Sequence, residues 1–240
     1  MCIRDRFSIG LLYAQYNLLS IAALAQAIQY TTVDMVALAL LAAAFALKLA
    51  AVPLHMWAPD TYSVAPAGIT PMIYTSSAVS MYALYRMVFT LYGDSLNVTA
   101  IGWFIVILGI LSMLIGVLMA IHQTDIKRLM AYHAISQSGY MLLGLGVGLA
   151  VLAEPAALAA YGRDAMNGGL FHLINNALYK GMLFLTAEAI FFRIGTRDLN
   201  RMGGLGHSMK WTTAFFIIGA LAIAGIPPMN GFASKLIIYQ

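Results

Sequence analysis

The stretch ALALLAAAFALKLAAV, residues 37–52, decides the class of fold, because a single lysine, Lys48, stands in an otherwise unbroken apolar run. The run belongs to a longer apolar segment, Val33–His55, and similar segments recur along the chain. A helix needs roughly 20 mainly apolar residues to cross a membrane, whereas a transmembrane strand alternates apolar and polar residues. This unbroken run, rich in Ala and Leu, therefore predicts a membrane-spanning helix.

The composition of the whole chain agrees with a membrane solvent. Of its 240 residues, 62% are hydrophobic and 9% are charged, whereas soluble domains are about 25% charged. The mean hydropathy is +0.84. These values exclude soluble, disordered and fibrous classes. The net charge of +4 does not indicate a nucleic-acid partner, because the basic residues are placed as membrane topology requires.

The length rule predicts an all-α, polytopic transmembrane bundle with six full spans and the start of a seventh. The predicted spans are Phe7–Tyr30, Val33–His55, Thr70–Leu91, Ala100–His122, Leu129–Ala153 and Met166–Phe192, with a seventh beginning at Trp211. Residues 1–6 are charged and unlike the rest, so we expect a non-native junction there and one transmembrane domain over residues 7–240. The chain stops inside an apolar segment, which is typical of a fragment.

The basic residues predict the orientation of these spans. With seven spans, eight Lys and Arg residues fall on the side of the N-terminus: Arg4, Arg6, Lys127, Arg128, Arg193, Arg197, Arg201 and Lys210. Arg86 and Arg163 fall on the other side. Cytoplasmic loops carry the excess of Lys and Arg. We therefore expect an inner-membrane protein whose loops with Lys127 and Arg128, and with Arg193–Lys210, face the cytoplasm.

Prolines and glycines predict interruptions in three of the spans. Pro53 and Pro59 lie near the end of the second span, Pro227 and Pro228 interrupt the last one, and Gly168–Gly169 open the sixth. Proline removes a backbone donor and clashes with the preceding helical turn. Inside a membrane, such a break is tolerated where protein or a wet cavity satisfies the freed groups.

Lys48, Lys180 and Lys235 are the most informative polar residues, since all three lie inside or at the edge of apolar spans. A lysine at the bilayer centre costs at least about 2.5–3.5 kcal/mol, and burial disfavours its charged form. Such lysines could carry protons. The alternative is that each amine extends to the membrane surface from a helix end, but a proton path explains all three lysines together.

The sixth span adds a polar face around Lys180. His172, Asn176 and Lys180 are spaced four apart and so share one side of a helix, and Glu188 continues that side. Imidazole, amide, amine and carboxylate groups together are typical of a proton relay. Interhelical hydrogen bonds that only fasten the bundle are the alternative. His133 on the fifth span is as well explained by a satisfied core histidine as by a proton carrier.

Other cofactor and metal chemistry finds little support in the residues. His55, His122 and His207 have no ligand spacing, so we predict no metal site. Cys2 is the only cysteine, which excludes a disulfide framework and the thiolates that an iron–sulfur cluster needs. We therefore expect no cofactor in this chain.

Four motifs, taken in order, resemble one family. They are LKLAAVPLHMWAPDTYSVAPA (47–67), QTDIKRLMAYHAISQSGYMLLGL (123–145), FHLINNALYKGMLFL (171–185) and GTRDLNRMGG with the residues that follow it to SKL (195–236). Together they resemble the antiporter-like membrane subunits of respiratory complex I, which are shared with Mrp antiporters and membrane-bound hydrogenases. The resemblance covers nearly all of the chain after Arg6.

The resemblance implies an inverted-repeat fold with a broken helix in each repeat. Lys48 then matches the broken-helix lysine of the first repeat, and Lys235 matches its counterpart in the second. Lys180 matches the lysine of a helix that carries two histidines in some members, with His172 at the first and Asn176 in place of the second. These matches imply a proton relay of Lys48, Lys180, Lys235 and His172, with Asn176, Glu188 and His133 as secondary candidates.

Two departures from the family pattern concern the first repeat. Many members have a lysine in the middle of the helix after the first broken one, but the span Thr70–Leu91 offers hydroxyl groups there: Tyr74, Thr75, Ser76, Ser77 and Ser80. A proton link through this span must therefore use hydroxyls and water. The glutamate that partners the first broken-helix lysine in the family lies upstream of this chain.

The favoured hypothesis is a proton-translocating membrane subunit of a complex I-type NADH:quinone oxidoreductase, an enzyme only as part of that complex. The resemblance implies other membrane subunits as partners, FMN and iron–sulfur clusters in partner subunits, and H⁺ as the ion, with Na⁺ as the alternative. An Mrp-type Na⁺/H⁺ antiporter subunit or a hydrogenase subunit is the second hypothesis. A purely structural membrane subunit, whose lysines only pair with neighbours, is the third.

Overall fold

A computed structural model describes residues 2–66, 68–91 and 98–240, and in these ranges the chain is almost entirely helical with no strand. The α-helices are α1 (Cys2–Tyr16), α2 (Ile21–Ala27), α3 (Thr32–Leu49), α4 (Trp57–Val64), α5 (Ile69–Leu91), α6 (Val98–Ile121), α7 (Ile126–Ala150), α8 (Pro155–Ala157), α9 (Arg163–Ile194), α10 (Leu205–Ser208), α11 (Lys210–Ala224) and α12 (Asn230–Tyr239). A π-helical turn, Leu158–Gly162, precedes α9, and a 3-10 turn, Leu199–Arg201, precedes α10.

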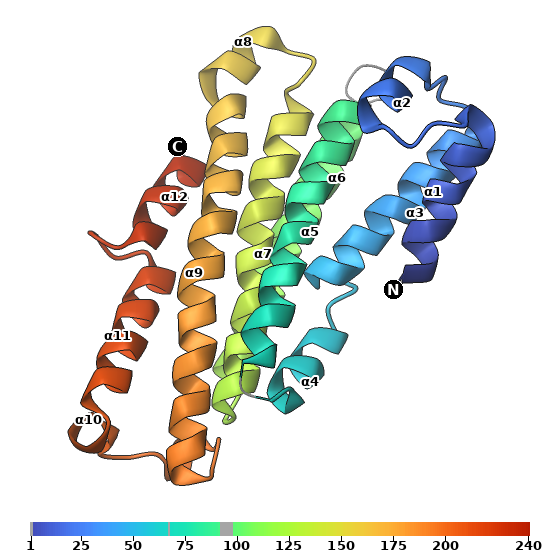
Figure 1. Cartoon of the computed structure of the whole chain (residues 1–240). Coiled ribbons are helices and arrows are strands. Elements are labelled where there is room, and N and C mark those ends of the chain that lie inside the picture. Colours follow the sequence, from blue (N-terminus) through green and yellow to red (C-terminus); the bar gives the residue numbers. More distant parts are fainter. Residues whose placement is uncertain (1, 67, 92–97) are drawn as a thin grey trace.

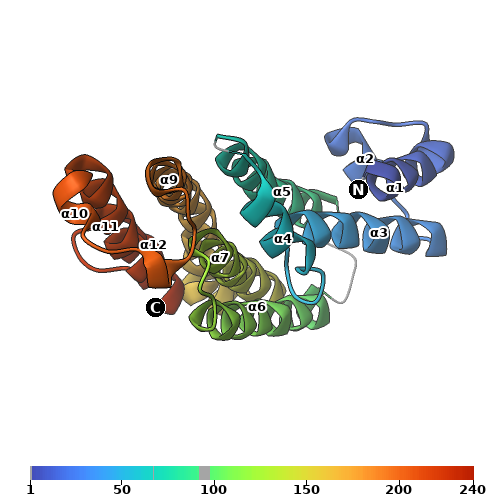
Figure 2. The same ribbon diagram turned by 90° about the horizontal axis from the view of Figure 1, so that it is seen from below.

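Helix α7 lies at the centre of the bundle, between α6 and α9 (Figure 1). Helices α1–α3 lie at one side and α10–α12 at the other (Figure 2). The seam between α6 and α7 is built on glycines, since Gly102, Gly109 and Gly116 recur every seven residues on the buried face of α6. A Cβ added to Gly109 would lie 3.0 Å from the backbone of α7. Small residues of this kind let two membrane helices approach closely.

The outer face of α6 is exposed and apolar. Its exposed side chains include Trp103, Phe104, Ile107, Leu114 and Leu118. In a soluble protein such a face would be a docking or aggregation surface, but it is typical of a helix that faces lipid or another apolar helix.

The count of six full spans and a partial seventh remains a prediction. Among the described residues, Thr32–Leu49 and Val98–Ile121 are long and apolar enough to cross a membrane by themselves. The expected span Phe7–Tyr30 is not one straight helix, because α1 and α2 are separate helices that meet at an angle of 55°. That this bent pair forms one span stays a prediction. The chain turns there through Asn17, whose φ of 53° is in the left-handed region.

The expected junction over residues 1–6 and the single domain over 7–240 also remain predictions. Residues 2–6 form the beginning of α1, and Met1 lies outside the described residues.

Two of the expected interruptions are present. Helix α3 ends at Leu49 and the chain passes through Pro53 to the short helix α4, while α11 ends at Ala224 and passes through Pro227 and Pro228 to α12. Pro59 does not interrupt a helix, because it lies in the first turn of α4, where its missing N–H has no acceptor to lose.

The third expected interruption is absent, since α9 runs unbroken through Gly168–Gly169. These glycines serve packing instead. A Cβ on Gly168 would meet Ile237 and Ile238 of α12, and one on Gly169 would meet the hydroxyl of Tyr85 on α5. The two glycines therefore let α5 and α12 approach α9 closely, and α9 begins earlier than expected, at Arg163.

Candidate functional site

The predicted face of the sixth span exists and is buried. His172, Asn176 and Lys180, called the α9 row below, are each 0% exposed. Helix α9 contacts α5, α7, α11 and α12, so these neighbours cover it on several sides. The spacing of four residues places three polar groups on one side of the helix, and the surrounding helices then remove them from solvent.

Lys180 is the most unusual member of the α9 row. Its ammonium group donates to the carbonyl of Met130 on α7, at 2.8 Å. Within the described residues, no carboxylate forms an ion pair with it. Lysine is almost never fully buried without a charged partner, so this side chain requires an explanation other than packing.

His172 connects α9 to α7 and α12 through its two ring nitrogens. Its Nε2 lies 3.1 Å from Oε1 of Gln137, and its Nδ1 lies 3.0 Å from the hydroxyl oxygen of Ser234. The Tyr179 hydroxyl donates to the same Gln137 oxygen, at 3.0 Å. Because that oxygen only accepts, Nε2 is assigned as the donor and Nδ1 accepts from Ser234. One imidazole thus bridges three helices.

Lys235 lies directly after the second break, on α12, and is 8% exposed. Its Nζ donates to the carbonyl of Ile223, at 2.6 Å, near the end of α11. The same Nζ lies 4.9 Å from the centre of the Tyr140 ring, within the range of a cation–π interaction. The Tyr140 ring in turn lies 5.6 Å from the His172 ring. The structure therefore brings Lys235 and His172 together around one tyrosine.

Asn176 connects the α9 row to α5. Its Nδ2 donates to the hydroxyl of Tyr74. Its Oδ1 is buried, and no donor among the described residues reaches it. Beside it, Asn175 donates to the backbone carbonyl of Asn230, at 3.0 Å, which ties α9 to the start of α12.

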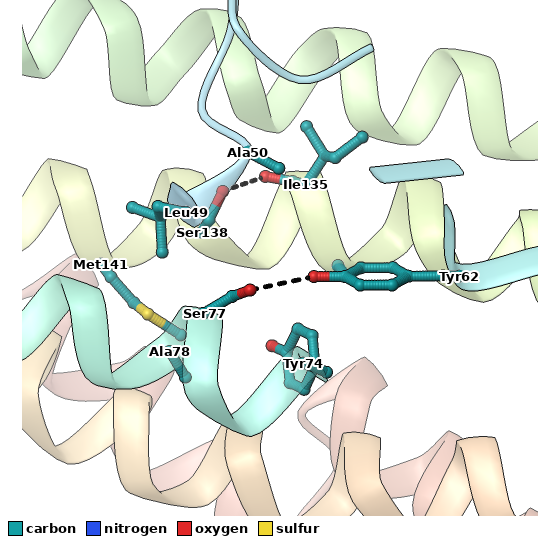
Figure 3. Close-up of a pocket in the computed structure, with 10 residues that line it drawn as sticks. Leu49, Ala50, Tyr62, Tyr74, Ser77, Ala78, Ile135, Ser138 and Met141 are labelled. Atoms are coloured by element: carbon teal, nitrogen blue, oxygen red, sulfur yellow. Dashed lines mark hydrogen bonds between the residues drawn. The ribbon is translucent and has the colours of Figure 1, made fainter. Parts of the chain in front are cut away.

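A small cavity lies at the end of α3, and its hydroxyls come from three helices, α4, α5 and α7 (Figure 3). Tyr62, Tyr74, Ser77 and Ser138 supply these hydroxyls, and the cavity is called the hydroxyl cavity below. The Tyr62 hydroxyl donates to Ser77, at 3.4 Å. The cavity has a volume of about 10 Å³, near the lower limit for one water molecule. Its other lining residues are apolar and include Leu49, the neighbour of Lys48.

The remaining predicted site residues form no hydrogen bond with the α9 row in the part of the chain that the structure describes. Lys48 is half-buried in the last turn of α3 and has no hydrogen-bond or ion-pair partner among the described residues. His133 is half-buried on α7, and its Nδ1 is a buried nitrogen without a partner in the same part of the chain. Glu188 continues the α9 row in sequence, but its carboxylate forms an ion pair with Lys127.

Lys127 is a buried charged residue that the sequence analysis missed. We counted it as a loop cation, but it belongs to the first turn of α7 and is 1% exposed. Besides Glu188, it contacts the carbonyl of Ala65, at 2.6 Å. Both partners are more than 60 residues away along the chain, so no local pattern indicated them.

Tyr62, Tyr140, Tyr179 and Ser234 were also absent from the predicted site. Their hydroxyls or rings contact the α9 row or the hydroxyl cavity. Their positions within the quoted motifs were the available signal. No group of three or more His, Cys, Asp or Glu residues that could hold a metal ion occurs in the described part of the chain.

Comparisons with known proteins agree in pointing to one family. Residues 6–240 match the family described as NADH:quinone oxidoreductase/Mrp antiporter, TM. Formate hydrogenlyase subunit 3 of Escherichia coli (strain K12) is 36% identical over 199 residues, which are 82% of this chain and 32% of that protein. NADH-quinone oxidoreductase subunit N of Desulforudis audaxviator (strain MP104C) is 34% identical over 235 residues, 95% of this chain and 44% of that protein.

The fold is also that of a solved structure. A chain in the Mrp complex from Dietzia sp. DQ12-45-1b superposes with a TM-score of 0.83 at 30% identity. The match covers 98% of this chain and 41% of the other chain. The present chain thus spans less than half the length of each of these three proteins.

Proposed function

The chain belongs to the NADH:quinone oxidoreductase/Mrp antiporter transmembrane family, a class of multi-pass membrane proteins, and from this membership we propose that it is a proton-translocating subunit of a complex I-type NADH:quinone oxidoreductase. Its neighbours among solved structures are subunits of multisubunit membrane complexes. Other membrane subunits are therefore its expected partners.

The burial of Lys180 is the observation that carries this proposal. It is 0% exposed, its recorded partner is a neutral carbonyl, and no acidic side chain in the described ranges compensates its charge. An ionisable residue inside the membrane is costly and typically marks an ion or proton pathway. A purely structural role would be served better by an apolar side chain of similar volume.

The proposed proton path joins the two broken helices through α9. On one side it runs from Lys48 past the hydroxyl cavity to Tyr74 and Asn176. Hydroxyl groups both donate and accept hydrogen bonds, so these groups and a water molecule could pass a proton where the family often has a lysine.

On the other side the path runs from Lys180 to His172 and from there to Lys235. His172 contacts Ser234, the residue before Lys235 on α12. Histidine takes up and releases protons near neutral pH, which suits an intermediate carrier. Water must bridge Lys180 to His172 and Lys235, because no direct hydrogen bond joins Lys180 to either side chain among the described residues. In this proposal His133, Asn176 and Glu188 remain secondary members.

The rest of the proposal follows from the family. The two broken helices α3–α4 and α11–α12 belong to two inverted repeats, and the chain contains six full spans and part of a seventh. It lies in the inner membrane, with the start of α7, which carries Lys127 and Arg128, and the segment Arg193–Lys210 at the cytoplasmic side. It holds no redox cofactor itself, and partner subunits carry FMN and iron–sulfur clusters.

The second candidate is a subunit of an Mrp-type Na⁺/H⁺ antiporter or of a membrane-bound hydrogenase. Its support is the similarity to the Mrp complex of Dietzia and to formate hydrogenlyase subunit 3. In an antiporter the ion gradient, and not electron transfer, would drive transport.

Purification of the native complex in mild detergent separates these candidates. Flavin together with iron is expected for the complex I-type machine, and transport in proteoliposomes should then require NADH and a quinone. Iron with nickel and without flavin would favour the hydrogenase. Transport without any reductant, in a preparation without iron or flavin, would favour the antiporter.

A further inference from the structure

Cations from two distant elements hold the C-terminal end of α4, the half-helix after the first break. Lys127, in the first turn of α7, donates to the carbonyl of Ala65, at 2.6 Å. Arg197, in the segment after α9, donates to the carbonyl of Ser63. The last carbonyls of a helix lack intrahelical partners and carry partial negative charge, so cations stabilise them. Helix α4, the start of α7 and the end of α9 lie at the same end of the bundle (Figure 1).

Glu188 compensates the charge of Lys127. The two side chains form an ion pair, and Lys127 and Glu188 are 1% and 7% exposed. Removing one member of a buried ion pair leaves an uncompensated charge, which is strongly destabilising.

The other charged groups near this end of α4 are arranged differently. Arg128 pairs with Asp60 of α4, at 3.1 Å, but both side chains are exposed. Asp125 accepts hydrogen bonds from the backbone N–H groups of Lys127 and Arg128 and so caps α7. Within the described ranges, Glu188 is thus the acidic side chain that pairs with Lys127.

The position of α4 decides where the Tyr62 hydroxyl lies. Tyr62 is 2% exposed, and its hydroxyl faces Ser77 across the hydroxyl cavity. Its ring packs edge-on against Phe184 of α9 and Tyr74 of α5, at centroid distances of 5.8 and 6.2 Å. Thr70 donates to the carbonyls of both Tyr62 and Ala65, so a shift at Ala65 would be transmitted to Tyr62.

We propose that Lys127 is a positioning residue, which, with Glu188 as its counter-charge, fixes the C-terminal end of α4 and thereby holds the Tyr62 hydroxyl in the hydroxyl cavity. This proposal rests on the proposed proton path, in which that cavity links Lys48 to Tyr74 and Asn176. Lys127 does not carry the proton in this role. From its place at one end of the bundle, Lys127 keeps the hydroxyl groups of the path in position.

The test uses the full-length protein in its native membrane complex, with two readouts. Proton transport reports on the path, and amide hydrogen exchange of residues 61–65 reports on α4. We expect Lys127→Met to raise the exchange rate of these amides about tenfold, since α4 then opens more easily, and to slow transport several-fold. Lys127→Arg keeps a cationic donor and should preserve both readouts.

An exchange of the two charges separates positioning from simple fastening of α7 to α9. Lys127→Glu combined with Glu188→Lys restores the ion pair, but the carboxylate at position 127 cannot donate to the Ala65 carbonyl. We expect this double variant to assemble, while α4 stays unprotected and transport stays slow. Tyr62→Phe should slow transport without raising exchange in α4, because it removes the hydroxyl and leaves the helix held.

Arg128→Gln is the matched control, because it removes an exposed ion pair to the same helix. Exposed pairs contribute little to stability, so neither readout should change. The positioning role is refuted if Lys127→Met leaves exchange and transport as in the wild type, or if the charge exchange restores both. If Lys180→Met also leaves transport intact, the proposed function itself fails. If Lys180→Met stops transport while Lys127→Met does not, only the positioning role fails.

Discussion

Both broken helices leave backbone groups without intrahelical partners, and different kinds of side chain satisfy these groups at the two breaks. At the first break, between α3 and α4, side chains of other elements satisfy the freed groups: Ser112 of α6 accepts from the N–H of Val52, at 3.0 Å, and Trp57 donates to the carbonyl of Leu47, at 2.7 Å. At the second break, between α11 and α12, the ammonium group of Lys235 itself donates to the carbonyl of Ile223.

The difference concerns the lysine of each break. Lys235 is buried, bonded to the broken backbone and close to Tyr140. Lys48 is half-buried and has no partner in the described ranges, and its neighbour Leu49 lines the hydroxyl cavity. A change in the protonation of Lys235 therefore alters a hydrogen bond that supports the break, whereas the same change at Lys48 leaves the first break as it is.

The largest effect on proton transport is expected at Lys180, which joins the two breaks in the proposed path. Lys180→Met should reduce proton transport by at least about tenfold, because it removes the ionisable group that joins the two halves of the path. Transport by the complex in proteoliposomes measures this. Lys210→Met is the matched control, since Lys210 is exposed in the first turn of α11 and should tolerate the change. Equal transport in both variants would show that the two breaks work without Lys180.

The lysines of the two breaks should differ in their contribution to stability. Lys235→Met leaves the Ile223 carbonyl without its donor and should lower the free energy of unfolding by about 1.5–3 kcal/mol. Lys48→Met removes no hydrogen bond found in the described ranges and should change it by less than about 0.5 kcal/mol. Denaturant titration of the purified complex compares them, with Lys235→Arg as the variant that keeps a donor. A similar loss in both methionine variants would contradict the comparison.

The first break should depend on a side chain of another helix. Ser112→Ala leaves the N–H of Val52 without its acceptor, and we expect a loss of stability of about 1–2 kcal/mol. The same titration measures it, and local hydrogen exchange at residues 50–56 should rise while residues 225–229 are unaffected. Ser76→Ala, at an exposed position of α5, is the control. If the exchange at both breaks rose together, the two breaks would not be independent.

The smallest effect is expected in the hydroxyl cavity. Ser77→Ala removes one of several hydroxyls there, and we expect a two- to fivefold decrease in transport, since a single neutral hydrogen bond contributes about 0.5–1 kcal/mol. Ser76→Ala serves again as the control, because Ser76 is exposed and does not line the cavity. An unchanged rate in Ser77→Ala would place the link from Lys48 elsewhere.

Local properties of the sequence predicted much of the site. The breaks at Pro53 and at Pro227 and Pro228 follow from the missing N–H of proline, which acts within one helical turn. The α9 row follows from a spacing of four residues. The continuity of α9 through Gly168–Gly169 could not be predicted in the same way, because these glycines allow the close approach of α5 and α12.

Other features needed distant partners and so escaped prediction. The bend after Tyr16 has neither a proline nor a glycine at its position to indicate it. Lys127 looked like a loop cation because its neighbours in sequence are polar, and only its contacts with Glu188 and Ala65 reveal a buried residue. Tyr140 likewise acquires its role from a ring contact with His172 and from Lys235 on another helix.

The sequence by itself determined the membrane class, the helical fold, the two breaks at prolines and the residues that face one side of α9. These depend on hydropathy and on spacing along a helix, which are local quantities. The tertiary structure alone decided which helices meet at each break, which hydroxyls gather in one cavity and which charges compensate each other. Those outcomes depend on the packing of elements that lie far apart in the chain, and the sequence pattern of any one element does not contain them.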